Sequence, residues 1–441
     1  MAELGHTLGA LSYDDLPPAV RERLPVVLAD LLGVTAAGMA TPELRGLVAA
    51  WRPERGPHAL IGTDVRTTAE TAAMLAAVAA CSQELDEGNK YAAGHPAAHV
   101  VFAAVAAAQV SGRAVSGREL LTAVAAGYEV AARFGAALRR DARWHPHGSW
   151  GATGAACAAA MVLGATPAQV AAAIDASTGL MTVTPWETVL AGDFTRNLWM
   201  GQANLAGLNA ARLAVAGLAA NRGGAAASLA MLGELDPGVL VRELGRRWLC
   251  AEGYLKRHAA CSYTHAAVDI VQSLRTQRAW SPDEVVHVQV ATHSLAAPLL
   301  RRDPTSRLAG MFSLPFVVAL AATGVEVTPA SMEPGTAAFE RAQALSARVE
   351  VEIRDELDAY LPDRRITEVT VTFDDGESLA LAQPNPIGDS AHFPLSEVEA
   401  VAKLDALLGA SAGGGLLAAV RDLERAEDVT VALERLPLPV G

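Results

Sequence analysis

Alanine-rich apolar segments, broken by glycine and proline, recur through the first 265 residues of the chain. The segment "LPPAVRERLPVVLADLLGVTAAGM" begins with prolines, which a helix start tolerates, and its apolar residues recur at helical spacing. Because small side chains let helices approach closely, these segments predict a tight, all-helical domain. Similar patterns cover residues 67–82, 97–111, 117–137, 150–163, 167–178, 200–217 and 223–232.

The pattern changes after about residue 280. The segments "EVVHVQVATH", "VEVEIR", "ITEVTVTF" and "ESLALAQ" alternate apolar and polar residues or are rich in β-branched residues, as half-buried strands are. The sequence "FDDGES" between the last two is typical of a hairpin turn. Helical patterns occur between the strands at 310–322 and 336–346. We therefore predict a smaller α+β domain with a short, mostly antiparallel sheet.

A chain of 441 residues exceeds what one ordinary hydrophobic core supports, so two domains are expected. Helical periodicity returns in "LSEVEAVAKLDALLG" and "GLLAAVRDLERAED", and we expect these last helices to pack on the first domain. The prediction is a mainly α fold. A large all-helical domain comprises residues 1–268 plus 395–441, and the α+β domain comprises residues 269–394. The glycine-rich "GASAGGG" at 409–415 is predicted to be a flexible loop.

The composition restricts the class of partner. A net charge of −13 argues against nucleic acid, whose phosphates require a basic surface, but permits a small anionic substrate held by a local cluster of cations. With 51% hydrophobic and 19% charged residues, some apolar surface is expected to be covered in an oligomer. No apolar run reaches the roughly 20 residues that span a bilayer, and no signal-peptide pattern is present. We expect a soluble, cytoplasmic protein without a membrane partner.

Four segments of the apolar half carry polar residues at helix ends. Together they offer histidines, cations and carboxylates on apolar walls, which is the composition needed to bind a small polycarboxylate and remove a proton α to a carboxylate. Such a proton is weakly acidic, so the site must supply a base and cations where the enediolate charge develops. The segments are "ELDEGNKYAAGHPAAHVV" (84–101), "RWHPHGSWGATGAACAAA" (143–160), "DFTRNLWMGQANLAG" (193–207) and "YLKRHAACSYTHAAVD" (254–269).

Several of these residues have competing interpretations. His145 and His147 form an HxH pair that can bind zinc, but no third ligand follows at a convincing spacing, so no metal is expected. Cys261, with His265 one helical turn later, has the pattern of a nucleophile and its base, although a cysteine on a helix face is more often part of the packing. His99 lies one turn past His95, where a structural role is as plausible as a catalytic one. The usual motifs of nucleotide binding and triad hydrolysis do not occur.

Taken in order, these motifs resemble those of the MmgE/PrpD family, which includes 2-methylcitrate dehydratases, cis-aconitate decarboxylases and iminodisuccinate epimerases. The resemblance covers nearly the whole chain, and its strength lies in seven matches in the right order. The matching segments are "YDDLPPAVRERLPVVLADLLGVTAAG", "LDEGNKYAAGHPAAHVVFAAVA", "AAGYEVAARFGAAL", "WHPHGSWGATGAACAAAMVLG", "TRNLWMGQANLAGLNAARLA", "KRHAACSYTHAAVD" and "MFSLPFVVALA".

The resemblance implies a large all-helical domain, a smaller α+β lid, a homodimer, no cofactor, and an active site in the cleft between the domains. Together with the polar segments, it gives two sets of candidate residues. The catalytic candidates are His95, His145, Lys256 and Asp86, with Asp86 orienting and tuning its cationic neighbours. The substrate-binding candidates are Lys90, Arg196, Arg257, His147, Cys261 and His265.

The chain also departs from the family pattern. Arg196 stands where many members have lysine, and an arginine binds a carboxylate bidentately but does not readily act as a base. Met311 and Phe316 stand where "KFSLPY" has a charged residue and a tyrosine, and Ala259 replaces the proline of a KxxP motif. These departures indicate a divergent subfamily, whose substrate can differ from the family's well-known tricarboxylates.

The leading hypothesis is a cofactor-independent lyase that dehydrates or hydrates a small di- or tricarboxylate, such as a 2-methylcitrate-like hydroxy acid, by α-proton abstraction. An epimerase or isomerase, or a decarboxylase, of a related polycarboxylate requires the same kind of stabilised carbanion. A non-catalytic binding protein on the same fold is the alternative from another class. The sequence leaves these alternatives open.

Overall fold

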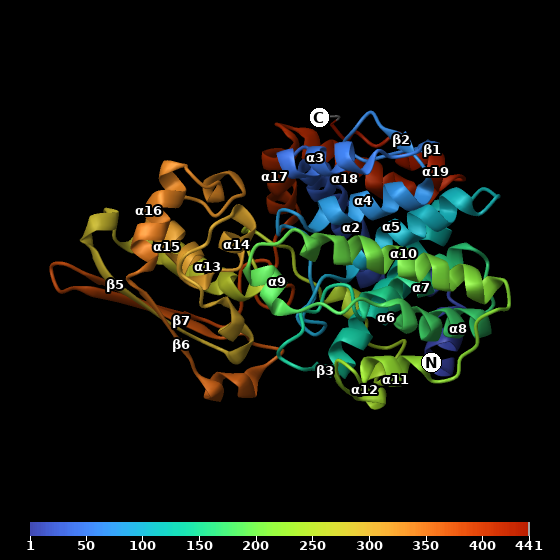
Figure 1. Cartoon of the computed structure of the whole chain (residues 1–441), viewed down its shortest axis with the longest axis horizontal. Coiled ribbons are helices and arrows are strands. Elements are labelled where there is room, and N and C mark those ends of the chain that lie inside the picture. Colours follow the sequence, from blue (N-terminus) through green and yellow to red (C-terminus); the bar gives the residue numbers. More distant parts are fainter. Residues whose placement is uncertain (440–441) are drawn as a thin grey trace.

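The computed structural model describes residues 1–439, which form a helical body and a smaller lid placed side by side along the long axis of the molecule (Figure 1). The body is built around α7 (Gly151–Val162), which is buried along nearly its whole length. Four helices pack against it: α5 (Pro96–Val110), α6 (Gly117–Ala137), α8 (Pro167–Ser177) and α10 (Thr195–Val215). The fold is therefore mainly α, as predicted.

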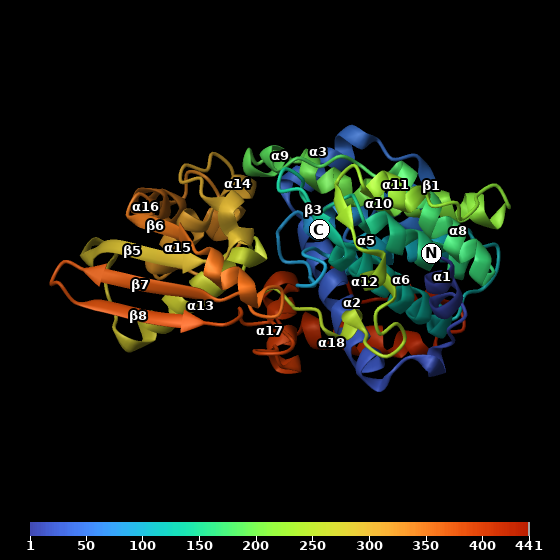
Figure 2. The same cartoon turned by 90° about the horizontal axis from the view of Figure 1, so that it is seen from below.

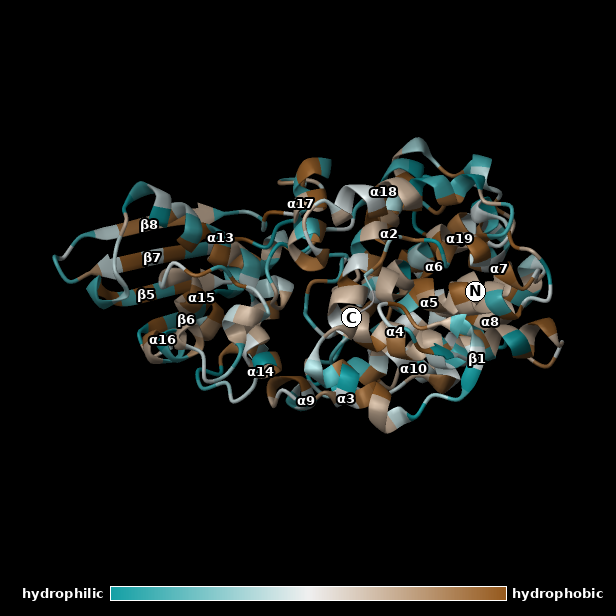
Figure 3. Cartoon of the chain, turned by 90° about the horizontal axis from the view of Figure 1, so that it is seen from above, coloured by the Kyte–Doolittle hydropathy of each residue, from teal (hydrophilic) through white to brown (hydrophobic). Residues whose placement is uncertain are grey.

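Small residues bring these central helices into close contact. A methyl group added at Gly154 of α7 would lie 2.3 Å from the carbonyl oxygen of Gly127 in α6. One added at Gly207 of α10 would lie 2.3 Å from the side chain of Ala155. The alanines and glycines that dominate the sequence are thus what allows the backbones to approach, and the inner helices are mostly hydrophobic along their length (Figure 3).

Further helices and two small sheets complete the body. The helices α17 and α18 pack on each other and on α2, so the end of the chain returns to the body. The helices are α1 (Ala2–Leu8), α2 (Pro18–Met39), α3 (Pro42–Trp51), α4 (Ala69–Cys81), α9 (Trp186–Leu190), α11 (Gly224–Leu229), α12 (Pro237–Val241), α17 (Glu397–Leu408), α18 (Ala412–Asp422) and α19 (Val429–Leu433). The two-stranded sheets pair β1 (Arg55–Ala59) with β2 (Arg66–Thr67), and β3 (Leu138–Arg140) with β4 (Gly233–Leu235).

Two helix starts differ from the sequence prediction. The helix α10 begins at Thr195 rather than at 200, because a polar first turn masks the apolar period and Asp193 Oδ1 accepts a hydrogen bond from the Thr195 amide at 2.8 Å. The prediction of a loop over 409–415 is wrong in its second half, where α18 has already begun. Asp405 Oδ1 accepts from the Gly413 amide at 2.7 Å, and a side chain at Gly413 would lie 2.6 Å from the backbone oxygen of Val401. The glycines here allow α18 to pack closely on α17.

The lid contains a four-stranded sheet in the order β6-β5-β7-β8. The predicted strands, the hairpin after β7 and the mostly antiparallel character of the sheet are confirmed; β5 pairs with β7 and β7 with β8 in antiparallel fashion, and β5 pairs with β6 in parallel. The parallel pairing arises because the long connection between these two strands crosses over through helices. The strands are β5 (Val285–Thr292), β6 (Val349–Ile353), β7 (Thr367–Phe373) and β8 (Ser378–Gln383).

One face of this sheet is covered by helices (Figure 2). The helix α13 (Ser262–Gln277) packs on β7, β8 and α15 (Leu314–Ala322), and α16 (Ala337–Ser346) packs on α15. The short α14 (Arg307–Met311) precedes α15. The alternation along β7 matches this arrangement, since Val369, Val371 and Phe373 are buried while the residues between them are partly exposed.

No single helix among residues 1–439 combines the length and apolar character that crossing a membrane requires. Two sharply bent helix pairs meet the same test of length and composition: Pro18–Met39 with Pro42–Trp51, and Glu397–Leu408 with Ala412–Arg425.

Candidate active site

The four polar segments meet at the junction of body and lid, around a narrow cavity. The body contributes polar side chains from three segments, and the lid side contributes the start of α13. Aromatic rings of Trp186 and Phe312 form apolar walls. The polar lining residues are Glu84, His95, His145, His147, Arg196, Tyr254, Cys261, Ser262 and Tyr263.

A buried carboxylate joins two of the predicted cations. Glu84 Oε2 lies 2.8 Å from Lys256 Nζ, and Glu84 Oε1 forms an ion pair with Arg196. All three side chains are essentially inaccessible to solvent. Burial opposes ionisation of Glu84, but the charges of Arg196 and then Lys256 outweigh it and lower its pKa to about 2. The carboxylate in turn helps to raise the pKa of Lys256, so this lysine is a fixed cation at neutral pH.

Glu84 was in the polar loop that the sequence singled out, but no role was assigned to it. Its backbone has φ of +54°, a left-handed conformation that costs a residue with a side chain about 1–3 kcal/mol and is concentrated at functional sites. The sequence signal that could have identified it is an acid directly beyond the apolar α4, where burial demands a cationic partner.

Arg196 is held in place by several contacts. Its Nη1 donates hydrogen bonds to the backbone oxygen of Cys81 and to Asn197 Oδ1, both at 2.7 Å. Its guanidinium carbon lies 5.2 Å from the centre of the Phe312 ring. Among the described residues, Nε of Arg196 has no hydrogen-bond partner, so this N–H remains a donor for a bound anion.

His95 presents an unprotonated nitrogen. Its Nδ1 lies 2.6 Å from the backbone oxygen of Glu87, which can only accept, so Nδ1 carries the proton and Nε2 is free of one. Asp86 Oδ2 lies 3.3 Å from the same Nδ1. Burial, followed by the charge of Lys256, lowers the pKa of His95 to about 3, so the ring is neutral. Burial raises the pKa of Asp86 to about 6, with Lys256 opposing the shift and Glu84 adding to it.

His145 has the opposite tautomer. Its Nδ1 accepts a hydrogen bond from the His147 backbone N–H at 3.2 Å, so Nε2 of the neutral ring carries the proton. Burial, followed by the nearby charge of Arg196, keeps the pKa of His145 well below its usual range. The backbone N–H of His145 donates to Thr184 O at 2.6 Å, and its ring centre lies 4.6 Å from that of Trp186. The site therefore holds one imidazole base and one imidazole N–H donor.

His147 and His99 complete the imidazole cluster. The ring centre of His147 lies 4.9 Å from that of His95 and 4.4 Å from that of His145. Among residues 1–439, neither ring nitrogen of His147 has a hydrogen-bond partner. In His99 both are engaged: Nδ1 lies 2.8 Å from His95 O, and Nε2 accepts from the Gly148 amide at 3.1 Å. His99 thus supports the turn that carries His145 and His147.

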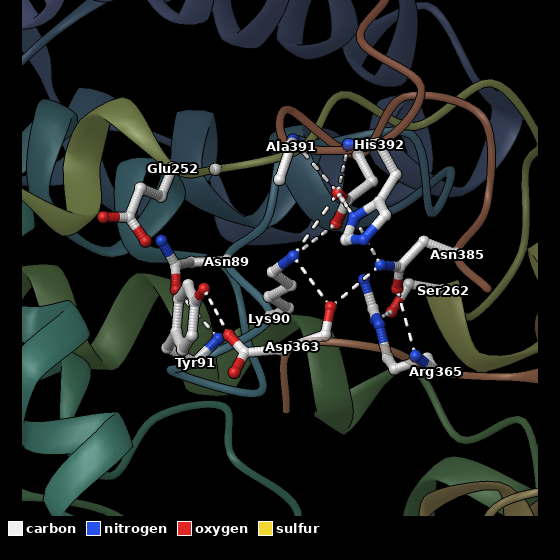
Figure 4. A network of polar contacts seen from close by, with 12 residues as sticks. Asn89, Lys90, Tyr91, Glu252, Ser262, Asp363, Arg365, Asn385, Ala391 and His392 are labelled. Atoms are coloured by element: carbon white, nitrogen blue, oxygen red, sulfur yellow. Dashed lines mark hydrogen bonds and ion pairs between the residues drawn. The ribbon is translucent and has the colours of Figure 1, made fainter. Parts of the chain in front are cut away.

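The structure does not bring every candidate to the cavity surface, since Lys256 and Asp86 lie behind the lining, against Glu84 and His95. Lys90 points toward the lid, where its Nζ lies 3.0 Å from Asp363 O and 3.1 Å from Asp389 Oδ2 (Figure 4). Arg257 is exposed and lines a separate cleft. His265 Nε2 lies 3.0 Å from Ala260 O, beneath the lining.

Cys261 lines the cavity, but burial raises the pKa of its thiol to about 11. It is therefore a thiol at neutral pH rather than the thiolate that a nucleophile requires.

Models of two protein domains match this chain: the MmgE/PrpD N-terminal domain over residues 2–241, and the MmgE/PrpD C-terminal domain over residues 258–423. The chain belongs to the MmgE/PrpD family. The family resemblance that the motifs indicated is thereby confirmed.

This MmgE/PrpD chain is similar along its whole length to two cis-aconitate decarboxylases of Aspergillus terreus. It is 26% and 25% identical to them, and each match covers 100% of this chain and 96% of the relative. It is 23% identical to the cis-aconitate decarboxylase-like protein oryM of Aspergillus oryzae, over 68% of this chain and 67% of that protein.

The departures from the family pattern fall in different places. Arg196 is part of the cavity wall, whereas Met311 is fully buried. Phe316 is also buried, with its ring centre 4.8 Å from that of Phe339 inside the lid. In this part of the MmgE/PrpD chain, it is Phe312 that reaches the cavity.

Residues 1–439 contain no group of three or more His, Cys, Asp or Glu side chains placed to hold a metal ion. The histidine cluster is arranged ring against ring rather than around a common point.

Proposed function

We propose that this protein is a lyase that removes a proton α to a carboxylate of a small di- or tricarboxylate and expels a β-hydroxyl group as water. The observation that supports this reaction is the opposed pair of tautomers at His95 and His145. Dehydration requires a base for the α-proton and a donor for the leaving hydroxyl, and the two neutral rings supply one of each.

In this proposal Nε2 of His95 takes the α-proton, and the electron pair left on the α-carbon delocalises into the adjacent carboxylate. Lys256 and the free Nε–H of Arg196 stabilise the resulting enediolate. Nε2–H of His145 donates a hydrogen bond to the β-hydroxyl, and the imidazolium formed at His95 gives its proton to this oxygen as the carbon–oxygen bond breaks and the double bond forms, so that water leaves and both rings are neutral again. Asp86 and the Glu87 carbonyl keep the proton of His95 on Nδ1 and so leave Nε2 unprotonated and able to accept a proton.

Glu84 holds the side chains of Arg196 and Lys256 in position before substrate binds. Without it, Arg196 and Lys256 would be two buried, unpaired charges that repel each other. With it, they are held in place, and a substrate carboxylate joins an existing cluster whose geometry is already fixed.

Decarboxylation of a related polycarboxylate is the second candidate. It is favoured by the names of the relatives, two of which are cis-aconitate decarboxylases. In that reaction loss of CO2 generates the carbanion, and a histidine supplies the proton that replaces the carboxylate. Epimerisation would return the α-proton to the other face of the same carbanion.

Product analysis separates these reactions. Purified protein is incubated in D2O with a panel of hydroxylated and unsaturated di- and tricarboxylates, and the products are followed by proton and carbon NMR. The proposal predicts a new vinyl signal with loss of water. Release of CO2 would identify a decarboxylase, and α-deuteration with inversion but no new bond would identify an epimerase. Absence of exchange and turnover with every acid would contradict the enzyme proposal and favour a binding protein.

A further inference from the structure

Arg365 is a buried cation without a direct ion pair among the described residues, on the lid side of the cavity wall. It lies just before β7, and its side chain is only 3% exposed. Its Nη1 donates to Ser262 Oγ at 3.3 Å, but among residues 1–439 its Nε and Nη2 have no hydrogen-bond partner. Among the described residues its guanidinium forms no ion pair within 4.0 Å, and its charge acts on the carboxylate of Asp389, which pairs with Lys90, only from a longer distance. A buried charge left in this state is costly, which points to an anion that completes the site.

The residues that contact Arg365 belong to the cavity wall. Ser262 Oγ accepts its hydrogen bond, and the guanidinium carbon lies 5.0 Å from the centre of the Tyr254 ring. Both Ser262 and Tyr254 line the narrow cavity between body and lid. Figure 4 shows Arg365 and Ser262 in the polar network where body and lid meet. Arg365 is not itself a lining residue, so its guanidinium lies directly behind the wall that Ser262 and Tyr254 form.

The start of α13 adds a second anion-binding feature at the same place. Ser262 is the first residue of this 16-residue helix, and the N-cap residue Cys261 makes no side-chain capping hydrogen bond within the described chain. The first amides of a helix and its dipole favour a negative group. Arg365 and the α13 start thus present donors from two directions.

The charges on the two sides of the cavity differ. On the body side, Arg196 and Lys256 already share the carboxylate of Glu84. On the lid side, Arg365 has no such partner among the described residues. We infer that Arg365, Ser262 Oγ and the start of α13 form a second carboxylate subsite, which binds the carboxylate of a di- or tricarboxylate that is remote from the reacting carbon.

This inference deepens the proposed function and rests on it for the identity of the substrate. The subsite itself is a statement about binding, and it can be tested with acids that do not react. Glutarate carries two carboxylates, and monomethyl glutarate has almost the same length but only one. Calorimetric titration of both acids measures what the second carboxylate contributes.

The wild-type protein is expected to bind glutarate about 10- to 100-fold more tightly than monomethyl glutarate, the range for a charge-assisted pair. Arg365→Gln should lose most of this preference and leave the affinity for the monoester unchanged. Arg365→Lys, which keeps a charge but not the planar fork, should retain part of it. Arg364→Gln is the matched control, because this neighbouring arginine is exposed and should leave the preference intact.

Three outcomes would overturn the subsite: no preference for the diacid in the wild type, an unchanged preference in Arg365→Gln, or an equal loss of affinity for both acids. The last is what a purely structural role predicts. If Arg365→Gln fails to fold, the preference for glutarate over the monoester is compared between Arg365→Lys and Arg364→Gln, and a lower preference in Arg365→Lys supports the subsite. A selective loss of diacid binding without turnover of any acid would uphold the subsite and reject the proposed lyase. Turnover of an acid together with an unchanged diacid preference in Arg365→Gln would uphold the proposed lyase and reject the subsite.

Discussion

Lys256 Nζ lies 2.8 Å from Glu84 Oε2, and neither side chain is accessible to solvent. The same carboxylate pairs with Arg196, so one acid neutralises two cations drawn from distant parts of the sequence. This arrangement fixes the cationic wall of the candidate site and makes Glu84 the residue on which it depends.

Replacing Glu84 by glutamine should destabilise the fold and change its response to anions. Two buried cations lose their counter-ion, which costs about 3–5 kcal/mol of unfolding free energy. Because an anionic ligand then supplies the missing charge, glutarate should raise the Tm of the variant more than that of the wild type. Thermal unfolding with and without glutarate measures both effects. The control Glu187→Gln, at an exposed pair with Arg301, should behave as the wild type does, and equal ligand responses in all three proteins would contradict this role.

Glu87 should make stability depend on pH. Burial raises its pKa to about 8, while its Oε1 accepts from the Ala97 amide at 2.6 Å and its Oε2 accepts from Tyr128 at 2.9 Å. Because the folded-state pKa lies above the unfolded value, the folded state binds the extra proton between these values. The contribution to stability is complete below the unfolded pKa and is lost as the pH rises toward 8, by up to roughly 1.4 kcal/mol per pH unit.

The comparison of wild type with Glu87→Gln isolates this contribution, because the amide keeps the shape and the hydrogen-bonding capacity of the protonated acid. Urea unfolding between pH 5 and 8.5 should show a shallower decline in the variant, which becomes the more stable protein at the alkaline end. Parallel curves for the two proteins would show that Glu87 does not titrate in this range.

Lys90 is expected to couple body and lid through Asp389. Both side chains of the pair are nearly inaccessible to solvent. Asp389→Asn should lower the unfolding free energy by about 3–5 kcal/mol, because Lys90 loses its only carboxylate partner within residues 1–439. Lys90→Met should cost less, because Asp389 keeps His392 and two backbone amides. The double variant should lose less than the sum, with a coupling energy of roughly 1–3 kcal/mol. Additive losses, together with a raised KM in Lys90→Met, would instead indicate that Lys90 binds substrate, as its position in the family motif suggested.

Close approach of the central helices gives a prediction for the fold. A methyl group at Gly127 would lie 2.6 Å from Gly154 O, so Gly127→Ala should lower the unfolding free energy by about 1–3 kcal/mol. The control Gly46→Ala lies in α3 with nothing within 4 Å of the new atom, and should raise stability by up to about 1 kcal/mol. Chemical denaturation of both variants measures the difference, and similar effects at the two sites would exclude tight packing as the cause.

The sequence predicted those features that each segment determines locally. The strand over 366–373 and the hairpin that follows it were readable because alternation and turn residues lie within the segment itself. The parallel pairing of β5 with β6 could not be predicted from the segments themselves, because the register and direction of the strands depend on a long crossover connection. The helix start at Ala412 was missed because the glycines there serve packing against α17 rather than a loop.

The same distinction applies to the site. His95, His145, Arg196 and Lys256 were identified because histidines and cations stand out in an alanine-rich sequence. The sequence did not reveal the role of Glu84, because that role depends on an ion pair with Lys256, a residue 172 positions away. Nothing in "LPDRRI" distinguishes the buried Arg365 from its exposed neighbour, since only the fold decides which of the two is buried behind the cavity wall.

The exchange of the α-proton with solvent at His95 decides whether the site does the proposed chemistry. NMR in D2O follows deuterium incorporation at the α-carbon of a turned-over acid for the wild type, for His95→Gln, and for the control His287→Gln on the lid strand β5. Exchange is expected in the wild type and the control, with a loss of at least about 100-fold in His95→Gln, in the range for removal of a catalytic base. Exchange in His95→Gln at the wild-type rate would contradict the assignment of His95 as the base.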